Sequence, residues 1–199
     1  MMNSINVNDG LKIVERPAKI LSMDPRRFIL WLFIVTIVML FASLTSAYIV
    51  RRAEGNWLSF ELPFTFWVTS AILVLSSISI HWSLYSARKD NISNVKTGLI
   101  ATLILGFGFL VGQVYAWGDL VRQDVFFVGN PSGSFLYVLT GIHGLHIISA
   151  LVFLAIVIVL TFRYRVHSKK TLWVDLCATY WHFLDVLWLY LFGFLIINH

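Results

Sequence analysis

The chain is too apolar to be a water-soluble domain. Of its 199 residues, 58% are hydrophobic and 13% are charged, and the mean hydropathy is +0.80. A soluble domain of this size would be left with a largely apolar surface, so we predict an integral membrane protein. The net charge of +5 lies mostly in short gaps between apolar runs, which argues against nucleic acid as a partner. The single cysteine, Cys177, excludes an internal disulfide.

Five apolar segments are long enough to cross a bilayer as helices. A hydrocarbon layer of roughly 30 Å requires about 20 mostly apolar residues. In chain order, the predicted spans run from Phe28 to Val50, Pro63 to Tyr85, Thr97 to Trp117, Ser134 to Phe162 and Leu172 to Ile197. The predicted fold is therefore an all-α integral membrane bundle of five transmembrane helices. It comprises a tail of residues 1–27, in which we see no removable signal peptide, and a transmembrane domain of residues 28–199.

The basic residues predict how the bundle is oriented. The tail, the second gap and the fourth gap lie on one side of the membrane and carry 12 of the 15 Lys and Arg residues. Basic residues accumulate on the inner side of membranes. We therefore expect the N-terminus inside and the C-terminus outside.

The last two spans carry ionisable side chains at membrane depth, where such groups are costly and usually face the protein interior. The fourth span contains His143 and His146 in TGIHGLHIISA, and the fifth contains His182 and Asp185 in YWHFLDVLW. His146 and Asp185 each lie about 12 residues from the predicted outer end of their span, and so at similar depth. We hypothesise that His143 or His146 bonds Asp185, and that these four residues form a polar clasp between helices.

Other interpretations of the polar residues remain open. One haem held between His143 or His146 and His182 is an alternative to the clasp. A copper or zinc site needs three or more converging donors, which the sequence does not locate. The basic stretch with Arg163 and Arg165 is either simple inside-facing charge or a site for lipid phosphate. Small residues predict close helix approach: Gly106, Gly108, Gly112, Gly141 and Gly144.

The motifs together resemble a known family. TGIHGLHIISA followed by YWHFLDVLWLYLF is similar to the signature of subunit III of haem-copper respiratory oxidases, the cytochrome c and quinol oxidases. WLFIVTIVMLFASLTSAYI resembles the first helix of the short, five-helix form. LPFTFWVTSAILVLSSISIHW and LGFGFLVGQVYAWGDL resemble the second and third.

The resemblance implies an accessory role in a bacterial-type inner (cytoplasmic) membrane. Haems and copper would belong to partner subunits I and II, so no catalytic, cofactor or metal residue is expected on this chain. Subunit I would be its main contact, with subunit II and a small subunit IV as further candidate partners. The family binds phospholipid and is thought to support proton uptake, oxygen access and stability. By similarity, His146, Arg163 and Arg165 would contact lipid headgroups.

The sequence also departs from the family. It resembles a form without the first two of seven helices. Ile37 and Ala116 stand where acidic residues are usual, which puts in doubt any carried-over role in proton handling. Two alternatives to the oxidase remain: a related subunit that accompanies nitric oxide reductase, and a membrane carrier of electrons through b-type haem.

Overall fold

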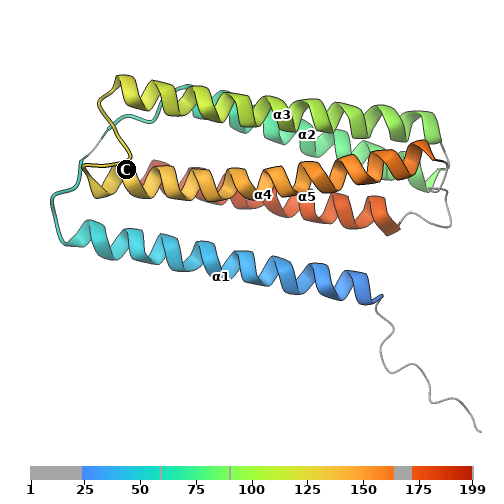
Figure 1. Ribbon diagram of the computed structural model, residues 1–199, viewed down its shortest axis with the longest axis horizontal. Helices are drawn as coiled ribbons and strands as arrows, with labels where there is room; N and C mark the ends of the chain where they lie inside the picture. Colours follow the sequence, from blue (N-terminus) through green and yellow to red (C-terminus); the bar gives the residue numbers. More distant parts are fainter. Residues whose placement is uncertain (1–23, 59, 90, 164–171, 199) are drawn as a thin grey trace, which may run out of the picture.

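A computed structural model describes residues 24–58, 60–89, 91–163 and 172–198, and this part of the chain is helical without strands. The helices are α1 (Pro25–Ala53), α2 (Thr65–Arg88), α3 (Ile92–Arg122), α4 (Pro131–Phe162) and α5 (Leu172–Asn198). All five are long and apolar enough to cross a membrane (Figure 1). The predicted all-α bundle is confirmed, while its orientation in the membrane stays a prediction.

Several helices extend past the predicted spans. α3 is five residues longer at each end than predicted, and α4 begins three residues before Ser134. The start of α4 is fixed by Asn130, whose side chain accepts a hydrogen bond from the Ser132 amide at 3.0 Å, and by Pro131 in the first helical turn. These polar signals fall outside the hydrocarbon layer, so a search for apolar runs does not detect them.

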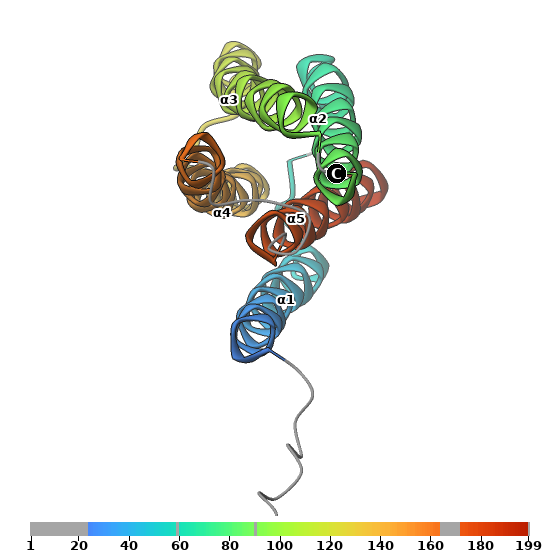
Figure 2. The ribbon, with the colours of Figure 1, turned by 90° about the vertical axis from the view of Figure 1, so that its right-hand side faces the viewer.

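α2, α3, α4 and α5 form an antiparallel bundle, and α1 stands to one side of it (Figure 2). Among the described helices, α1 packs against α4 and α5. We call the end where α1, α3 and α5 finish the C-terminal end of the bundle, and the opposite end the N-terminal end. Consecutive helices alternate in direction between these ends (Figure 1).

α1 contacts the bundle through one narrow stripe. Its buried residues are Ile34, Ile37, Phe41, Thr45 and Tyr48, spaced by three or four positions. That spacing keeps a single helix face against the neighbouring helices. Most of the remaining surface of α1 is exposed and apolar, as suits contact with lipid or another protein.

The glycines of α3 do not all serve close packing. A Cβ at Gly106 would lie 2.5 Å from Trp181 of α5, and one at Gly112 would lie 2.5 Å from Thr69 of α2. Both positions therefore confirm the predicted close approach of helices. The prediction is wrong for Gly108, which faces open space. Around Gly141 and Gly144 a Cβ would make only ordinary contacts, at 3.9 and 4.0 Å.

Candidate functional site

A layer of polar side chains lies buried along the seam between α2 and α5. Trp188 Nε1 donates to Ser70 Oγ at 2.9 Å, and Trp181 Nε1 donates to Ser76 Oγ at 2.9 Å. Each serine hydroxyl in turn donates to a carbonyl oxygen of its own helix. Both indoles are nearly inaccessible, so these bonds satisfy donors that would be costly to bury alone.

His182 belongs to the same seam. Its Nδ1 and the Ser77 hydroxyl share a hydrogen bond of 2.6 Å. Its ring lies 5.9 Å from the ring of His81, which is on the exposed side of α2. The polar clasp predicted from the sequence did not include the serines of the second span. The signal for them is spacing, since Ser70, Ser76 and Ser77 fall within two helical turns, as do their partners Trp188, Trp181 and His182.

Asp185 faces the protein interior, as predicted, with only 4% of the residue exposed. The predicted bond to His143 or His146 is not formed. Among the described residues, neither carboxyl oxygen of Asp185 has a hydrogen-bond partner. The Nδ1 atom of His146 instead lies 2.8 Å from the carbonyl oxygen of Ile142, one turn back on its own helix. The predicted equal depth of His146 and Asp185 did not determine the direction in which each side chain points around its helix axis.

His143 is enclosed by aromatic rings instead of acidic partners. Its ring centroid lies 5.0 Å from Trp188, 5.9 Å from Phe109 and 6.4 Å from Phe41, and the residue is fully buried. Within the described chain, neither ring nitrogen has a hydrogen-bond partner. His143 of α4 thus packs through its ring against α1, α3 and α5. The predicted four-residue clasp divides into this aromatic contact and the His182–Ser77 bond.

The predicted lipid-binding residues are not brought together. His146 is half-buried in the middle of α4, where its ring lies 5.8 Å from that of Phe41. Arg163 is exposed at the end of the same helix, 17 residues or about 25 Å further along. One phosphate cannot bind both side chains. Arg165 lies outside the described residues.

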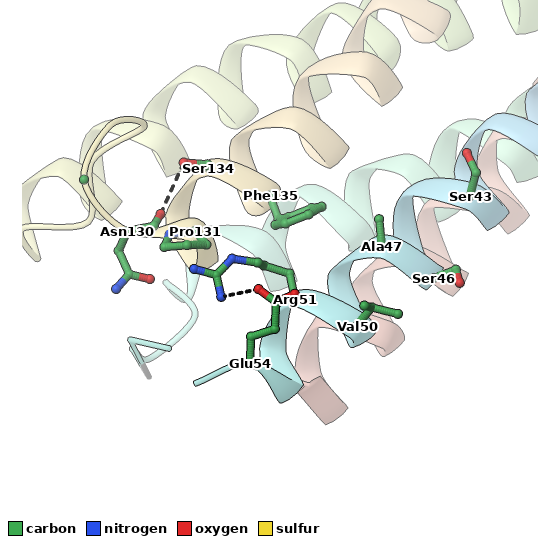
Figure 3. Close-up of a pocket in the computed structure, with 11 residues that line it drawn as sticks. Ser43, Ser46, Ala47, Val50, Arg51, Glu54, Asn130, Pro131, Ser134 and Phe135 are labelled. Carbon is green, nitrogen blue, oxygen red and sulfur yellow. Dashed lines mark hydrogen bonds and ion pairs between the residues drawn. The ribbon is translucent and has the colours of Figure 1, made fainter. Parts of the chain in front are cut away.

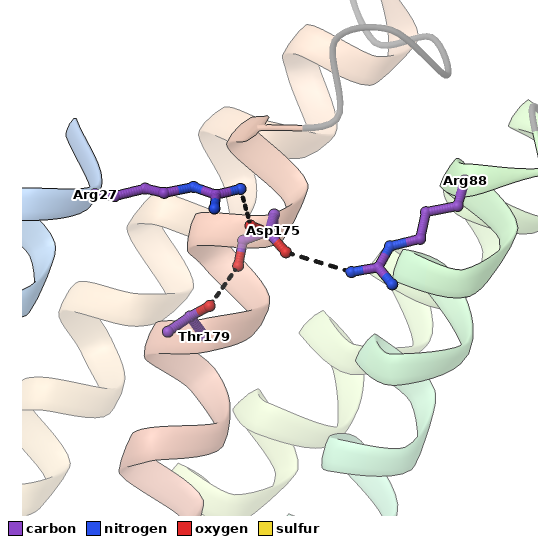
Figure 4. Close-up of polar contacts among 4 residues, drawn as sticks. All are labelled: Arg27, Arg88, Asp175 and Thr179. Atoms are coloured by element: carbon purple, nitrogen blue, oxygen red, sulfur yellow. Dashed lines mark hydrogen bonds and ion pairs between the residues drawn. The ribbon is translucent and has the colours of Figure 1, made fainter. Parts of the chain in front are cut away.

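An ion-pair cluster ties α1 to the bundle at the N-terminal end. Asp175 of α5 pairs with Arg27 of α1 at 2.7 Å and approaches Arg88 of α2 at 3.7 Å (Figure 4). The Thr179 hydroxyl donates a hydrogen bond to the backbone carbonyl of Asp175, one turn back on α5, at 2.8 Å. The cluster joins three helices, two of which are not in contact with each other along their length.

Metal-ligand candidates are sparse in the described residues. No three or more His, Cys, Asp or Glu side chains come close enough to hold an ion together in this part of the chain. His143 packs against aromatic rings, His182 bonds Ser77, and Asp185 forms no hydrogen bond among the described residues. The arrangement is suited to holding helices together.

Comparison with known proteins identifies the family of the chain. The family model described as cytochrome c oxidase subunit III matches residues 56–198. The chain belongs to this family. The matched region contains α2 to α5, the bundle with the buried polar layer, and does not contain α1. The resemblance to subunit III noted in the sequence is confirmed.

Individual relatives span most of the chain. A probable cytochrome c oxidase subunit 3 of Nocardia farcinica is 30% identical over 166 residues, which is 78% of this chain and 79% of the relative. The cytochrome c oxidase subunit 3 of Corynebacterium diphtheriae is 27% identical over 163 residues, with the same two shares. That of Spodoptera frugiperda is 31% identical over 133 residues, which is 67% of this chain and 86% of the relative.

Proposed function

We propose that this subunit III family member is a non-redox accessory subunit of a proton-translocating cytochrome c oxidase. In this proposal it packs on subunit I, which with subunit II carries the haems and copper that reduce oxygen to water. Its own contribution is to stabilise the complex, bind phospholipid and support proton uptake and oxygen access. No step of electron transfer is assigned to its residues.

The observation that carries the proposal is the use made of the buried polar groups. Ser70, Ser76 and Ser77 each bond an aromatic or imidazole side chain of α5. Groups that could have bound a cofactor instead join helices. His182 has one ring nitrogen engaged by Ser77, and aromatic side chains of α1, α3 and α5 pack around the His143 ring. This disfavours the rival in which a b-type haem lies between these histidines.

The relatives disfavour the second rival, a partner of nitric oxide reductase. The bacterial and insect relatives described above are named as subunits of cytochrome c oxidase. Those names also support cytochrome c over a quinol as the electron donor of the proposed complex. We infer that lipid contacts lie at His146 and Arg163 separately, because the two sites are too far apart to bind one headgroup.

The proposal is tested by purification through a tag on this chain. We expect the larger subunits to co-purify, with haem absorption and with oxygen consumption driven by reduced cytochrome c. The chain expressed alone should show no Soret band. A Soret band retained by this polypeptide would overturn the accessory role. Co-purification with nitric oxide reduction and without oxygen consumption would favour the second rival.

A further inference from the structure

The outward face of α2 carries one histidine within an apolar stripe. Exposed residues follow one another along this face at intervals of three or four positions: Trp67, Ala71, Val74, Ile78, His81 and Tyr85. Among the described helices, α2 packs against α3 and α5 (Figure 2). The stripe is the side of α2 that neither of them covers. Intervals of three and four positions are those of the seam between paired helices, so the stripe is suited to contact with a further helix.

His81 lies within the hydrocarbon layer. The ion pairs of Asp175 with Arg27 and Arg88 mark the level of the lipid headgroups at the N-terminal end of the bundle. His182 is seven residues from Asp175 on α5. His81 is likewise seven residues from Arg88 on α2, so both histidines lie about 10 Å deeper than the ion pairs. The headgroup layer is only about 5–8 Å thick, and a histidine side chain is too short to extend back to it as lysine and arginine side chains do.

The described part of the chain offers the His81 ring no hydrogen bond. The ring packs against that of His182, with 5.9 Å between the ring centroids. His182 is itself oriented by Ser77, whose hydroxyl lies 2.6 Å from Nδ1 of the imidazole. His81 is exposed, and an ionisable side chain at membrane depth normally faces protein or a water-filled cavity instead of lipid. The exposed imidazole therefore indicates that another protein chain covers this part of α2.

The groups around His81 indicate which side chain that chain brings. A protonated imidazole forms its strongest hydrogen bonds with a carboxylate. Asp175 lies about 10 Å closer to the headgroups and is already paired with Arg27 and Arg88. A second copy of this chain would not supply the acid, because its deep carboxyl group, Asp185, is buried. The partner that fits is a different chain with an acidic residue in a transmembrane helix.

We propose that the face of α2 around His81 binds a transmembrane helix of another oxidase subunit, which presents a carboxylate to the His81 ring. The apolar stripe packs against that helix. The single polar contact fixes the register of the two helices, as one buried polar residue does in other helix pairs. This inference rests on the proposed function in one respect only, since it requires the chain to be assembled with other subunits.

The first test is a cross-link in the tagged complex. A hydrophobic carbodiimide joins a lysine amine to a carboxylate in contact with it. We expect His81→Lys to be joined to one other subunit, and mass spectrometry of the product identifies the acidic residue. Asp185→Asn is included in every sample, so that the chain's own deep carboxyl group cannot react.

Ile100→Lys in the same background is the matched control. Ile100 is 38% exposed on α3, and it is two residues from Gly98, the residue whose carbonyl accepts a hydrogen bond from Ser79 of α2. It therefore lies at a depth comparable to that of His81, on a different face of the bundle. We expect at least tenfold less product from this variant.

The second test separates the contact between subunits from the stability of this chain. His81→Leu should leave thermal unfolding of the isolated chain in detergent unchanged, because the imidazole makes no hydrogen bond within its described part. Retention of the cross-linked subunit in the tagged complex should fall about tenfold on detergent washing, since a charge-assisted hydrogen bond is lost. Destabilisation of the isolated chain with retention unchanged would overturn the proposal, because the imidazole would then act within the chain.

The cross-linking results decide between a protein partner and lipid. An intact complex with no product from His81→Lys would place the imidazole against lipid and overturn the proposal. Equal product from the Ile100→Lys control, or product with a second copy of this chain, would also overturn it. Absence of larger subunits from the purified wild-type complex would contradict the proposed function itself, so the two failures are distinguishable.

Discussion

Asp185 is a buried carboxyl group whose oxygens form no hydrogen bond among the described residues, although the Ser77 hydroxyl of α2 lies near enough to interact with it. A buried polar group that forms no hydrogen bond reduces stability, because its interactions with water are lost and not replaced. Asp119 shows the opposite case. Its carboxylate accepts a hydrogen bond from the Thr65 hydroxyl at 2.6 Å and pairs with Arg122. Two acidic side chains of one protein thus have opposite energetic effects.

We predict that Asp185→Leu raises the stability of the chain by about 1–3 kcal/mol, since the unsatisfied carboxyl is replaced by an apolar group of similar size. Asp119→Leu should lower it, because Thr65 and Arg122 lose their acceptor. Thermal unfolding of the two purified variants in detergent measures both changes. Destabilisation by Asp185→Leu would contradict this prediction and would mean that the carboxyl is stabilised by a partner, such as the nearby Ser77 hydroxyl. The haem spectrum of the assembled complex should be unchanged in either variant.

At the scale of residues, the sequence predicts depth better than direction. The costs of burial alone indicate that Asp185 and His143 face inward, and both do. The choice of partner depends on the rotation of each helix about its axis, to within a fraction of a turn. Trp188 occupies the position beside His143 that the hypothesis gave to Asp185. Serines were passed over because a hydroxyl in a helix commonly bonds its own backbone.

Among the elements, α2 and α3 make the closest pair, and small residues allow it. Ser79 and Ser83 of α2 donate hydrogen bonds to α3, where the backbone carbonyls of Gly98 and Val95 accept them at 3.0 and 3.1 Å. A Cβ at Gly98 would lie 2.8 Å from Ser83 Cβ and 3.2 Å from the Ser79 carbonyl oxygen. The backbones therefore lie too close for a larger residue. Hydrogen bonds of this kind need that proximity.

We predict that Gly98→Ala destabilises the α2–α3 pair by about 1–3 kcal/mol, because the added methyl group forces the helices apart and lengthens both serine bonds. Gly108→Ala on the same helix is the control. Nothing lies within 4 Å of a Cβ at Gly108, so the higher helix propensity of alanine should leave stability equal or slightly greater. Unfolding followed by circular dichroism compares the two. Equal effects would contradict the packing argument.

Element number and type follow from the sequence because hydrocarbon thickness imposes one length on every span. The residues at which the helices begin and end do not follow from hydrocarbon thickness. They depend on capping side chains in the polar region, such as Asn91 and Asn130. The glycine prediction failed at Gly108 for a related reason. Composition shows that a helix can be approached closely, whereas the face that is approached depends on its neighbours.

The described part of the molecule is a four-helix bundle with α1 attached at both ends and along its buried stripe. At the N-terminal end, Arg27 pairs with Asp175. At the C-terminal end, the Tyr48 hydroxyl donates to the Asn198 carbonyl at 2.9 Å, and the Tyr48 ring lies 4.6 Å from that of Trp57. Between these attachments α1 contributes only a narrow stripe. A groove lies between α1 and the start of α4 at the C-terminal end (Figure 3).

The orientation that the basic residues predict can be tested by cysteine labelling. Gln123 is exposed at the C-terminal end of the bundle and Lys89 at the N-terminal end. A membrane-impermeant maleimide added to intact cells should label Gln123→Cys, and should label Lys89→Cys only after the membrane is permeabilised. The native Cys177, which is 2% exposed, should contribute no background. The reverse pattern would contradict the positive-inside argument.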